Sequence, residues 1–223
     1  MAVDLLVYQK LKEELNAKGV ILIAVSKTKP VEDLQKLYDA GQRDFGENYV
    51  QELVQKQALL PKDIRWHFIG HLQSNKVKMI APFVHLIHGV DSLKLLEVIN
   101  KEGGKLERQI NCLLQVHIAK EETKFGFDIP EAKQAAIIYF QEKKHAHVAV
   151  CGLMGMASFS DKLQLVEEEF KSLKQLFGEI KELYTNAIQF NILSMGMSGD
   201  YLMAIQNGST MVRVGSLLFG KRS

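Results

Sequence analysis

The chain has 223 residues, of which 47% are hydrophobic and 24% charged, with 28 basic and 26 acidic side chains. The hydrophobic share is that of a folded protein and excludes wholesale disorder, and the net charge of +2 gives no electrostatic reason to expect a nucleic-acid partner. All apolar runs are far shorter than the roughly 20 residues that a membrane-spanning helix needs, so no membrane partner is expected either.

An amphipathic helix is predicted first, because Val3, Val7, Leu11 and Leu15 recur at a spacing of four and Gly19 follows them. Short β-branched segments then alternate with helical patterns along the rest of the chain. The predicted strands are Val20–Val25, Arg43–Phe45, Arg65–Ile69, Val84–Val90, Ile110–Ile118, Val148–Met154, Phe190–Met195 and Met211–Val214.

Helical patterns fill the intervals between these strands. Pro30 suits a first helical turn, and Gly41 suits the left-handed position that ends the same helix. Alternation of this kind implies parallel strands with right-handed crossovers, and eight such units can close into a (β/α)₈ barrel. An open doubly wound sheet is the main alternative, but no G-x-G-x-x-G follows the first strand. We therefore predict a single α/β domain over residues 1–223, a (β/α)₈ TIM barrel with an extra N-terminal helix.

The two cysteines, Cys112 and Cys151, lie in apolar strand-like runs. This placement predicts buried free thiols in a reducing compartment, and so a cytoplasmic protein. No Cys/His grouping has zinc spacing, so no metal site is predicted, and no Ser-His-Asp arrangement is evident.

Glycine-bearing turns follow the last two predicted strands, which is where α/β barrels commonly bind phosphate. Ser198-Gly199-Asp200 follows the seventh strand, and Gly215-Ser216 follows the eighth. Backbone N–H groups in such turns can bind an anion closely. The alternative is purely structural, with Ser198 capping a helix and Gly215 permitting a turn.

Lys27 directly follows the apolar first strand, at the end of the barrel where sites occur. Partial desolvation there favours the free amine, which condenses with carbonyl compounds to give a Schiff base. The alternative is a surface lysine in a loop, and Lys29 is expected to be a solvated loop residue of that kind.

Strand alternation also predicts two polar residues inside the barrel. Arg213 and Gly215 share one face of the last strand, opposite Val212 and Val214, so Arg213 should face the lumen and find a partner. A structural ion pair with Glu47 or Asp200 is the alternative to a ligand. His67 also alternates inward, where it could serve the site. The alternative is a core histidine with a backbone partner.

At these residues the chain closely resembles the pyridoxal 5′-phosphate homeostasis proteins, the YggS/PROSC family. The matching stretches occur in family order from about residue 20 to 220, and together they are very specific. They are Ala24-Val25-Ser26-Lys27-Thr28-Lys29-Pro30, Phe45-Gly46-Glu47-Asn48-Tyr49-Val50-Gln51-Glu52, His67-Phe68-Ile69-Gly70, Leu72-Gln73-Ser74-Asn75-Lys76, Gly152-Leu153-Met154, Ser194-Met195-Gly196-Met197-Ser198-Gly199-Asp200 and Gly208-Ser209-Thr210-Met211-Val212-Arg213-Val214-Gly215 through Phe219-Gly220.

The resemblance implies a barrel like the N-terminal domain of alanine racemase, with pyridoxal 5′-phosphate held as a Schiff base on Lys27. It also implies that Arg213 meets the pyridine nitrogen, which keeps the ring unprotonated and makes it a poorer electron sink. The phosphate would be bound by Ser198, Gly199, Gly215 and Ser216, and the ring would be lined by Asn48 and His67. The family often has Thr at the position of Ser216, which keeps the hydroxyl.

Two functions compete, a cofactor carrier and an amino-acid racemase. A racemase needs a second base facing Lys27, which alanine racemases take from a tyrosine of a second domain. This chain ends at Ser223, and nothing aims Tyr49 or Tyr201 at a substrate, so a non-catalytic carrier in vitamin B6 homeostasis is expected. Its expected partners are the cofactor and, as recipients, apo-enzymes that require it, and it is expected to be a monomer. A sugar-phosphate isomerase without the cofactor is a third, weaker alternative.

Overall fold

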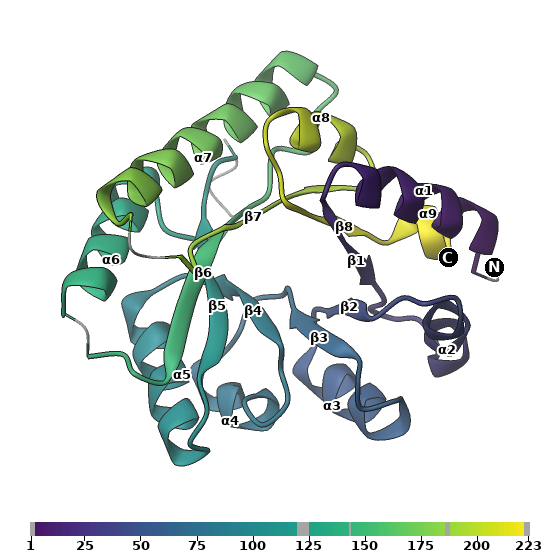
Figure 1. Ribbon diagram of the computed structural model, residues 1–223, viewed down its shortest axis with the longest axis horizontal. Coiled ribbons are helices and arrows are strands. Elements are labelled where there is room, and N and C mark those ends of the chain that lie inside the picture. The colour runs from purple at the N-terminus through teal and green to yellow at the C-terminus, as the bar shows by residue number, and fades with distance from the viewer. Residues whose placement is uncertain (1–2, 120–124, 143, 186–187, 221–223) are drawn as a thin grey trace.

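Parallel strands follow one another around a closed barrel in the computed structural model of the chain (Figure 1). The structure describes residues 3–119, 125–142, 144–185 and 188–220, and within these ranges the barrel has eight strands. Each strand pairs with the next, and β8 pairs with β1, which leaves no exposed sheet edge. The strands are β1 Ile21–Val25, β2 Asp44–Glu47, β3 Arg65–Phe68, β4 Leu86–Val90, β5 Ile110–Val116, β6 Val148–Gly155, β7 Ile192–Met197 and β8 Met211–Val214.

Helices connect consecutive strands and surround the barrel (Figure 1), which confirms the predicted α/β barrel. The first helix, α1, is tied to the end of the chain by a hydrogen bond from the Asp4 N–H to the Leu218 carbonyl oxygen (3.1 Å). The helices are α1 Leu5–Ala17, α2 Val31–Asp39, α3 Val50–Leu59, the 3₁₀ turn η1 Ser74–Lys76, α4 Val77–Ile80, α5 Leu93–Lys105, α6 Ile129–Glu142, α7 Leu163–Leu183, α8 Tyr201–Gln206 and α9 Ser216–Phe219. No helix in the described ranges is long and apolar enough to cross a bilayer.

Strand alternation divides the apolar residues into two layers. A large outer layer lies between the barrel and its helices, and a small inner cluster lies within the lumen. On β8, Val212 and Val214 belong to the outer layer, whereas Met211 belongs to the inner cluster and Arg213 shares its face. The predicted inward direction of Arg213 is therefore confirmed.

Two predicted strands are displaced in the structure. The second strand was expected at 43–45 but runs over Asp44–Glu47, and the seventh was expected at 190–195 but runs over Ile192–Met197. Glu47 can lie in a buried strand because Lys56 pairs with it. Phe190 precedes its strand because its ring stacks on Phe177 of α7 at 5.1 Å, outside the barrel.

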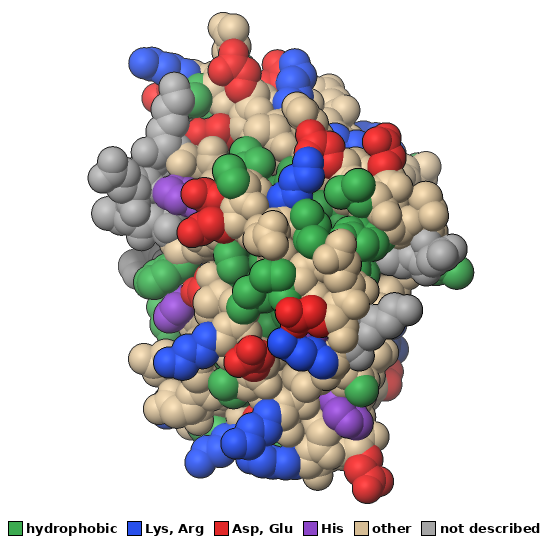
Figure 2. Space-filling view, turned by 90° about the vertical axis from the view of Figure 1, so that its left-hand side faces the viewer, with side chains coloured by type: hydrophobic (Ala, Val, Ile, Leu, Met, Phe, Trp, Pro, Cys, Tyr) green, Lys and Arg blue, Asp and Glu red, His purple; other side chains and the backbone are tan. Residues whose placement is uncertain are grey.

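The predicted helix ends are largely confirmed. Gly19 and Gly41 have φ of +66° and +94°, the left-handed conformation that follows a helix with little steric cost in glycine. Pro30, which was expected in the first turn of its helix, instead lies just before α2 as its N-terminal capping residue. On the face drawn in Figure 2, acidic and basic side chains are interspersed around exposed hydrophobic ones.

Candidate functional site

A cavity of about 1050 Å³ lies at the carboxyl ends of the barrel strands. Loops from the beginning and the end of the sequence meet around it, because β8 pairs with β1. It is the position at which α/β barrels carry their sites. Seven of the eight predicted site residues line it, namely Lys27, Asn48, Ser198, Gly199, Arg213, Gly215 and Ser216.

Lys27 lies two residues beyond β1, half-buried, in a tight turn. The Lys29 N–H donates to the Ser26 carbonyl oxygen at 3.0 Å, and Thr28 adopts a φ of +64°. The turn therefore holds the backbone of Lys27 firmly at the cavity wall. The expectation that Lys29 is a solvated loop residue is wrong, since it is half-buried and its Nζ donates to the Phe219 carbonyl oxygen at 2.9 Å.

A buried ionic cluster supports this turn from the side of α3. Lys56 is only 4% exposed, and its Nζ donates to the Ser26 carbonyl oxygen (2.7 Å), to Glu47 Oε1 (2.8 Å) and to Glu52 Oε1 (2.7 Å). The Thr28 N–H donates to the same oxygen of Glu52 at 2.6 Å. Burial raises the pKa of Glu47, and the charge and hydrogen bond of Lys56 offset this only in part. Sequence reasoning missed Lys56, although its spacing of four from Glu52 on a helix was a usable signal.

Arg213 is buried between two acceptors inside the barrel. Its Nη1 donates to Ser194 Oγ at 2.7 Å, and its Nη2 donates to the Gly155 carbonyl oxygen at 3.0 Å. Burial lowers the pKa of Arg213 to about 10, partly opposed by the charge of Asp200, so the guanidinium stays charged at neutral pH. The alternative of an ion pair with Glu47 is wrong, because Glu47 binds Lys56.

The two glycine turns are joined to each other. The Gly215 N–H donates to Ser198 Oγ at 3.2 Å, so the turns after β7 and β8 lie side by side. Ser198 therefore does not cap α8, whose capping position is taken by Asp200. A Cβ atom at residue 215 would lie 3.2 Å from the Val25 carbonyl oxygen, so glycine permits the close approach of β8 to β1.

Asn48 and His67 have different surroundings. Asn48 lines the cavity, and its Oδ1 is buried without a hydrogen-bond partner among the residues that the structure describes. His67 does not line the cavity. It faces the lumen, as its alternation predicts, but its Nε2 lies 3.0 Å from Asp44 Oδ1, toward the amino ends of the strands. The expectation that His67 contacts a ligand at the cavity is therefore not supported by its position.

One wall of the cavity is apolar, and sequence reasoning did not anticipate it. It is formed by the loop after β6, the start of α7 and α8, and its residues include Met156, Phe159, Leu163, Leu202 and Met203. Glu169 of α7 anchors the loop, because its carboxylate accepts hydrogen bonds at 2.7 Å from both the backbone N–H and the hydroxyl of Ser158. The wall gives the cavity a mixed character, typical of sites for small organic ligands.

Comparison with known proteins identifies the family. The chain matches the family model described as alanine racemase, N-terminal domain, over residues 8–223. It is 42% identical over 207 residues to the pyridoxal phosphate homeostasis protein of Pasteurella multocida, covering 92% of this chain and 87% of that one. The human protein of the same name is 41% identical over 214 residues, covering 90% and 76%. The chain belongs to the pyridoxal phosphate homeostasis protein family.

Solved structures agree with this family assignment. PipY of Synechococcus elongatus PCC7942, solved without pyridoxal phosphate (PLP), superposes with a TM-score of 0.88 at 35% identity and covers 96% of this chain and 98% of its own. The structure of PipY with PLP bound superposes with a TM-score of 0.83 at 34% identity. An alanine racemase of Clostridium difficile 630 is only 14% identical, with a TM-score of 0.74, and shares the fold.

Proposed function

We propose that the chain binds pyridoxal 5′-phosphate as a Schiff base on Lys27 and serves as a carrier in cellular PLP homeostasis. The observation that carries the proposal is that Lys27, Arg213 and the two joined glycine turns line one cavity. An amine, a fixed cation and a backbone anion site are the groups that an aldehyde, a pyridine nitrogen and a phosphate require.

The residues present fit this cofactor. The buried Asn48 Oδ1 has no partner among the described residues, which is costly unless a ligand donates to it, and the phenolic hydroxyl of the cofactor is such a donor. Gly199 and Gly215 line the cavity, with Ser198 and Ser216 beside them, and turns of this kind are suited to a phosphate.

The residues divide the work of binding among them. The Lys27 amine attacks the aldehyde carbon and one water leaves, which forms the C=N bond of the Schiff base. Ser198, Gly199, Gly215 and Ser216 hold the phosphate. The charged Arg213 donates to the ring nitrogen and so keeps it unprotonated, which weakens the ring as an electron sink and disfavours carbanion chemistry.

A carrier is favoured over a racemase by the position of the available tyrosines. Tyr201 lines the cavity, but burial raises the pKa of its phenol, and the charge and hydrogen bond of Glu14 on α1 raise it further. The phenol is therefore occupied by α1 and is a poor base at neutral pH. Tyr49 is 55% exposed. The relatives are also named for homeostasis rather than for catalysis.

We extend the proposal to the partners of the carrier. The recipients are apo-enzymes that require PLP, the compartment is the cytoplasm, and a monomer suffices because one chain brings seven of the eight predicted site residues to the cavity. The free buried thiols of Cys112 and Cys151 are consistent with a reducing compartment.

Borohydride trapping tests the Schiff base. Protein loaded with PLP should be yellow, and borohydride should fix the cofactor to the peptide that contains Lys27. Lys27→Ala should abolish the trapping, whereas Lys29→Ala, which removes another amine of the same cavity, should retain it. Trapping that persists in Lys27→Ala would overturn the assignment.

Chirality measurements test the carrier role. Incubation of the loaded protein with L-alanine and other amino acids should leave them unchanged, and mixing with an apo-enzyme should restore that enzyme's activity. Racemisation at ~1 s⁻¹ or faster would establish the alternative function.

A further inference from the structure

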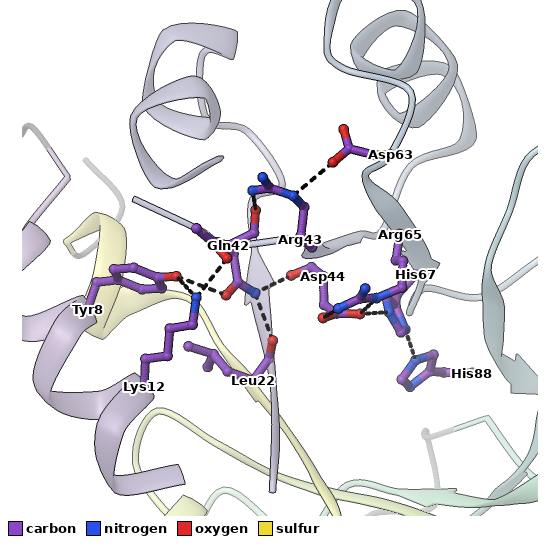
Figure 3. A network of polar contacts seen from close by, with 11 residues as sticks. Tyr8, Lys12, Leu22, Gln42, Arg43, Asp44, Asp63, Arg65, His67 and His88 are labelled. Atoms are coloured by element: carbon purple, nitrogen blue, oxygen red, sulfur yellow. Dashed lines mark hydrogen bonds and ion pairs between the residues drawn. The ribbon is translucent and has the colours of Figure 1, made fainter. Parts of the chain in front are cut away.

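We propose that Asp44, His67, His88 and Ser194 form a chain of hydrogen bonds that positions Arg213 for the cofactor ring. Every donor in this chain points toward Asp44. The inference rests on the proposed function, since it concerns the residue that meets the ring nitrogen. The chain crosses the barrel lumen, from the cavity to the amino ends of the strands, and its Asp44–His67–His88 section is drawn in Figure 3.

The links of the chain are all within hydrogen-bond distance. They are Arg213 Nη1 to Ser194 Oγ at 2.7 Å, Ser194 Oγ to His88 Nδ1 at 3.1 Å, His88 Nε2 to His67 Nδ1 at 3.0 Å, and His67 Nε2 to Asp44 Oδ1 at 3.0 Å. His67, His88, Ser194 and Arg213 are each at most 4% exposed, so bulk water does not compete with these bonds.

The end of the chain at Asp44 sets its direction. Burial alone would oppose ionisation of Asp44, but hydrogen bonds from Arg65 and His67 outweigh it and hold the pKa of this carboxyl well below its usual range. An ionised carboxylate only accepts hydrogen bonds, so His67 Nε2 must carry the proton. Burial lowers the pKa of His67, which keeps the ring neutral and leaves its Nδ1 as an acceptor.

The same logic passes from ring to ring. Because His67 Nδ1 accepts, His88 Nε2 must donate, and burial lowers the pKa of His88 well below the usual value, which keeps this ring neutral too. His88 Nδ1 is then an acceptor, so the Ser194 hydroxyl donates its hydrogen bond to it. The Ser194 oxygen consequently turns its lone pairs toward Arg213.

The result is a fixed acceptor for Arg213. The guanidinium is planar, so two fixed acceptors, Ser194 Oγ and the Gly155 carbonyl oxygen, determine the plane and the direction of its remaining N–H groups. Without His88 the Ser194 hydroxyl could rotate and present its proton to Arg213, which would repel it. Asp44, His67, His88 and Ser194 are therefore positioning residues, although none of them lines the cavity.

Nuclear magnetic resonance of the cofactor-free protein tests the direction of the chain. In ¹⁵N-histidine-labelled protein at neutral pH, His67 and His88 should both be neutral with the proton on Nε2. An Nδ1–H tautomer or a charged ring at either residue would overturn the inference. This measurement does not need PLP, so its result is independent of the proposed function.

Absorbance of the loaded protein tests the effect on the ring nitrogen. In the loaded protein, the absorbance changes with pH as the ring nitrogen gains or loses its proton. Ser194→Ala and His88→Leu should move the midpoint of this change by about one pH unit, because each removes a hydrogen bond that fixes Arg213, the charged donor to that nitrogen. Ser194→Thr keeps the hydroxyl and should restore the native midpoint. Cys151→Ala, which removes lumen packing outside the chain, should leave it unchanged.

The outcomes separate the two proposals. Borohydride trapping on Lys27 together with an unchanged midpoint in Ser194→Ala and His88→Leu would overturn the positioning role and leave the proposed function standing. Absence of trapping in the native protein would overturn the proposed function. The histidine tautomers would still show whether the hydrogen-bond chain runs in the proposed direction.

Discussion

Lys56 Nζ lies 2.7 Å from the carbonyl oxygen of Ser26, the residue that precedes Lys27. A buried cation of α3 thus holds the backbone of the turn that carries Lys27, the residue proposed to bind the cofactor. The same ammonium group pairs with Glu47 of β2, which is fully buried. Lys56 of α3 therefore connects its own helix to both the turn and β2. The position of Lys27 therefore depends on a residue outside its own loop.

Removal of Lys56 should destabilise the protein and loosen the Lys27 turn. Lys56→Met leaves the buried Glu47 carboxylate without its cation, with only the Ser26 hydroxyl still donating to it, and breaking a buried ion pair typically costs about 3 kcal/mol or more. Urea unfolding measures this loss, and slower borohydride trapping at Lys27 reports the loosened turn.

A surface ion pair supplies the control for Lys56. Lys171→Met breaks the exposed pair with Glu167 and should cost less than about 1 kcal/mol. If Lys56→Met and Lys171→Met lowered the free energy of unfolding equally, burial would not be the reason that the Lys56 pair matters for stability.

The joined glycine turns should determine affinity for the phosphate. Ser198→Ala removes a hydroxyl of the proposed phosphate site and should weaken PLP binding by about tenfold, because a hydrogen bond to a charged group is worth about 1.5–3 kcal/mol. Ser216→Thr keeps its hydroxyl and should bind normally. Pyridoxal, which lacks the phosphate, should bind Ser198→Ala and the native protein equally in absorbance titrations. A matching loss of pyridoxal affinity would show that Ser198 acts elsewhere.

Replacement of Arg213 by an acid should change the protonation of the cofactor ring. In Arg213→Glu a carboxylate faces the ring nitrogen in place of a donor, so the protonated ring is stabilised and the visible absorbance changes. Borohydride trapping on Lys27 should persist, which shows that the cavity is intact. An unchanged spectrum in a protein that still traps the cofactor would count against contact between Arg213 and the ring.

Gly152 should be irreplaceable for a reason of packing. A Cβ atom there would lie 1.8 Å from the Ile192 carbonyl oxygen of the adjacent strand, and φ is +153°. Gly152→Ala should lower the free energy of unfolding by more than about 2 kcal/mol. Gly178 lies within α7 with open space around it, so Gly178→Ala should raise that free energy by about 0.5–1 kcal/mol. Urea unfolding of both variants checks the contrast, and a stable Gly152→Ala would refute it.

Local patterns predicted much of the site. Two-residue alternation predicts that Arg213 and His67 lie in the lumen, because the side-chain period of a strand is a property of its backbone. The position of Lys27 after an apolar strand was equally visible. The limits of β2 and β7 were not visible, because they depend on contacts with helices. Glu47 of β2 pairs with Lys56 of α3, and Phe190, which precedes β7, stacks on Phe177 of α7.

The sequence by itself determined the order of strands and helices, the inward faces of the strands and the residue types at their carboxyl ends, since these depend on neighbouring positions in the chain. Only the tertiary structure decided which of those residues meet. Closure of β8 onto β1 brings Gly215 beside Val25, and the register of β2, β3 and β4 connects Asp44 to His67 and His88. Register depends on the packing of whole strands, which no short pattern encodes.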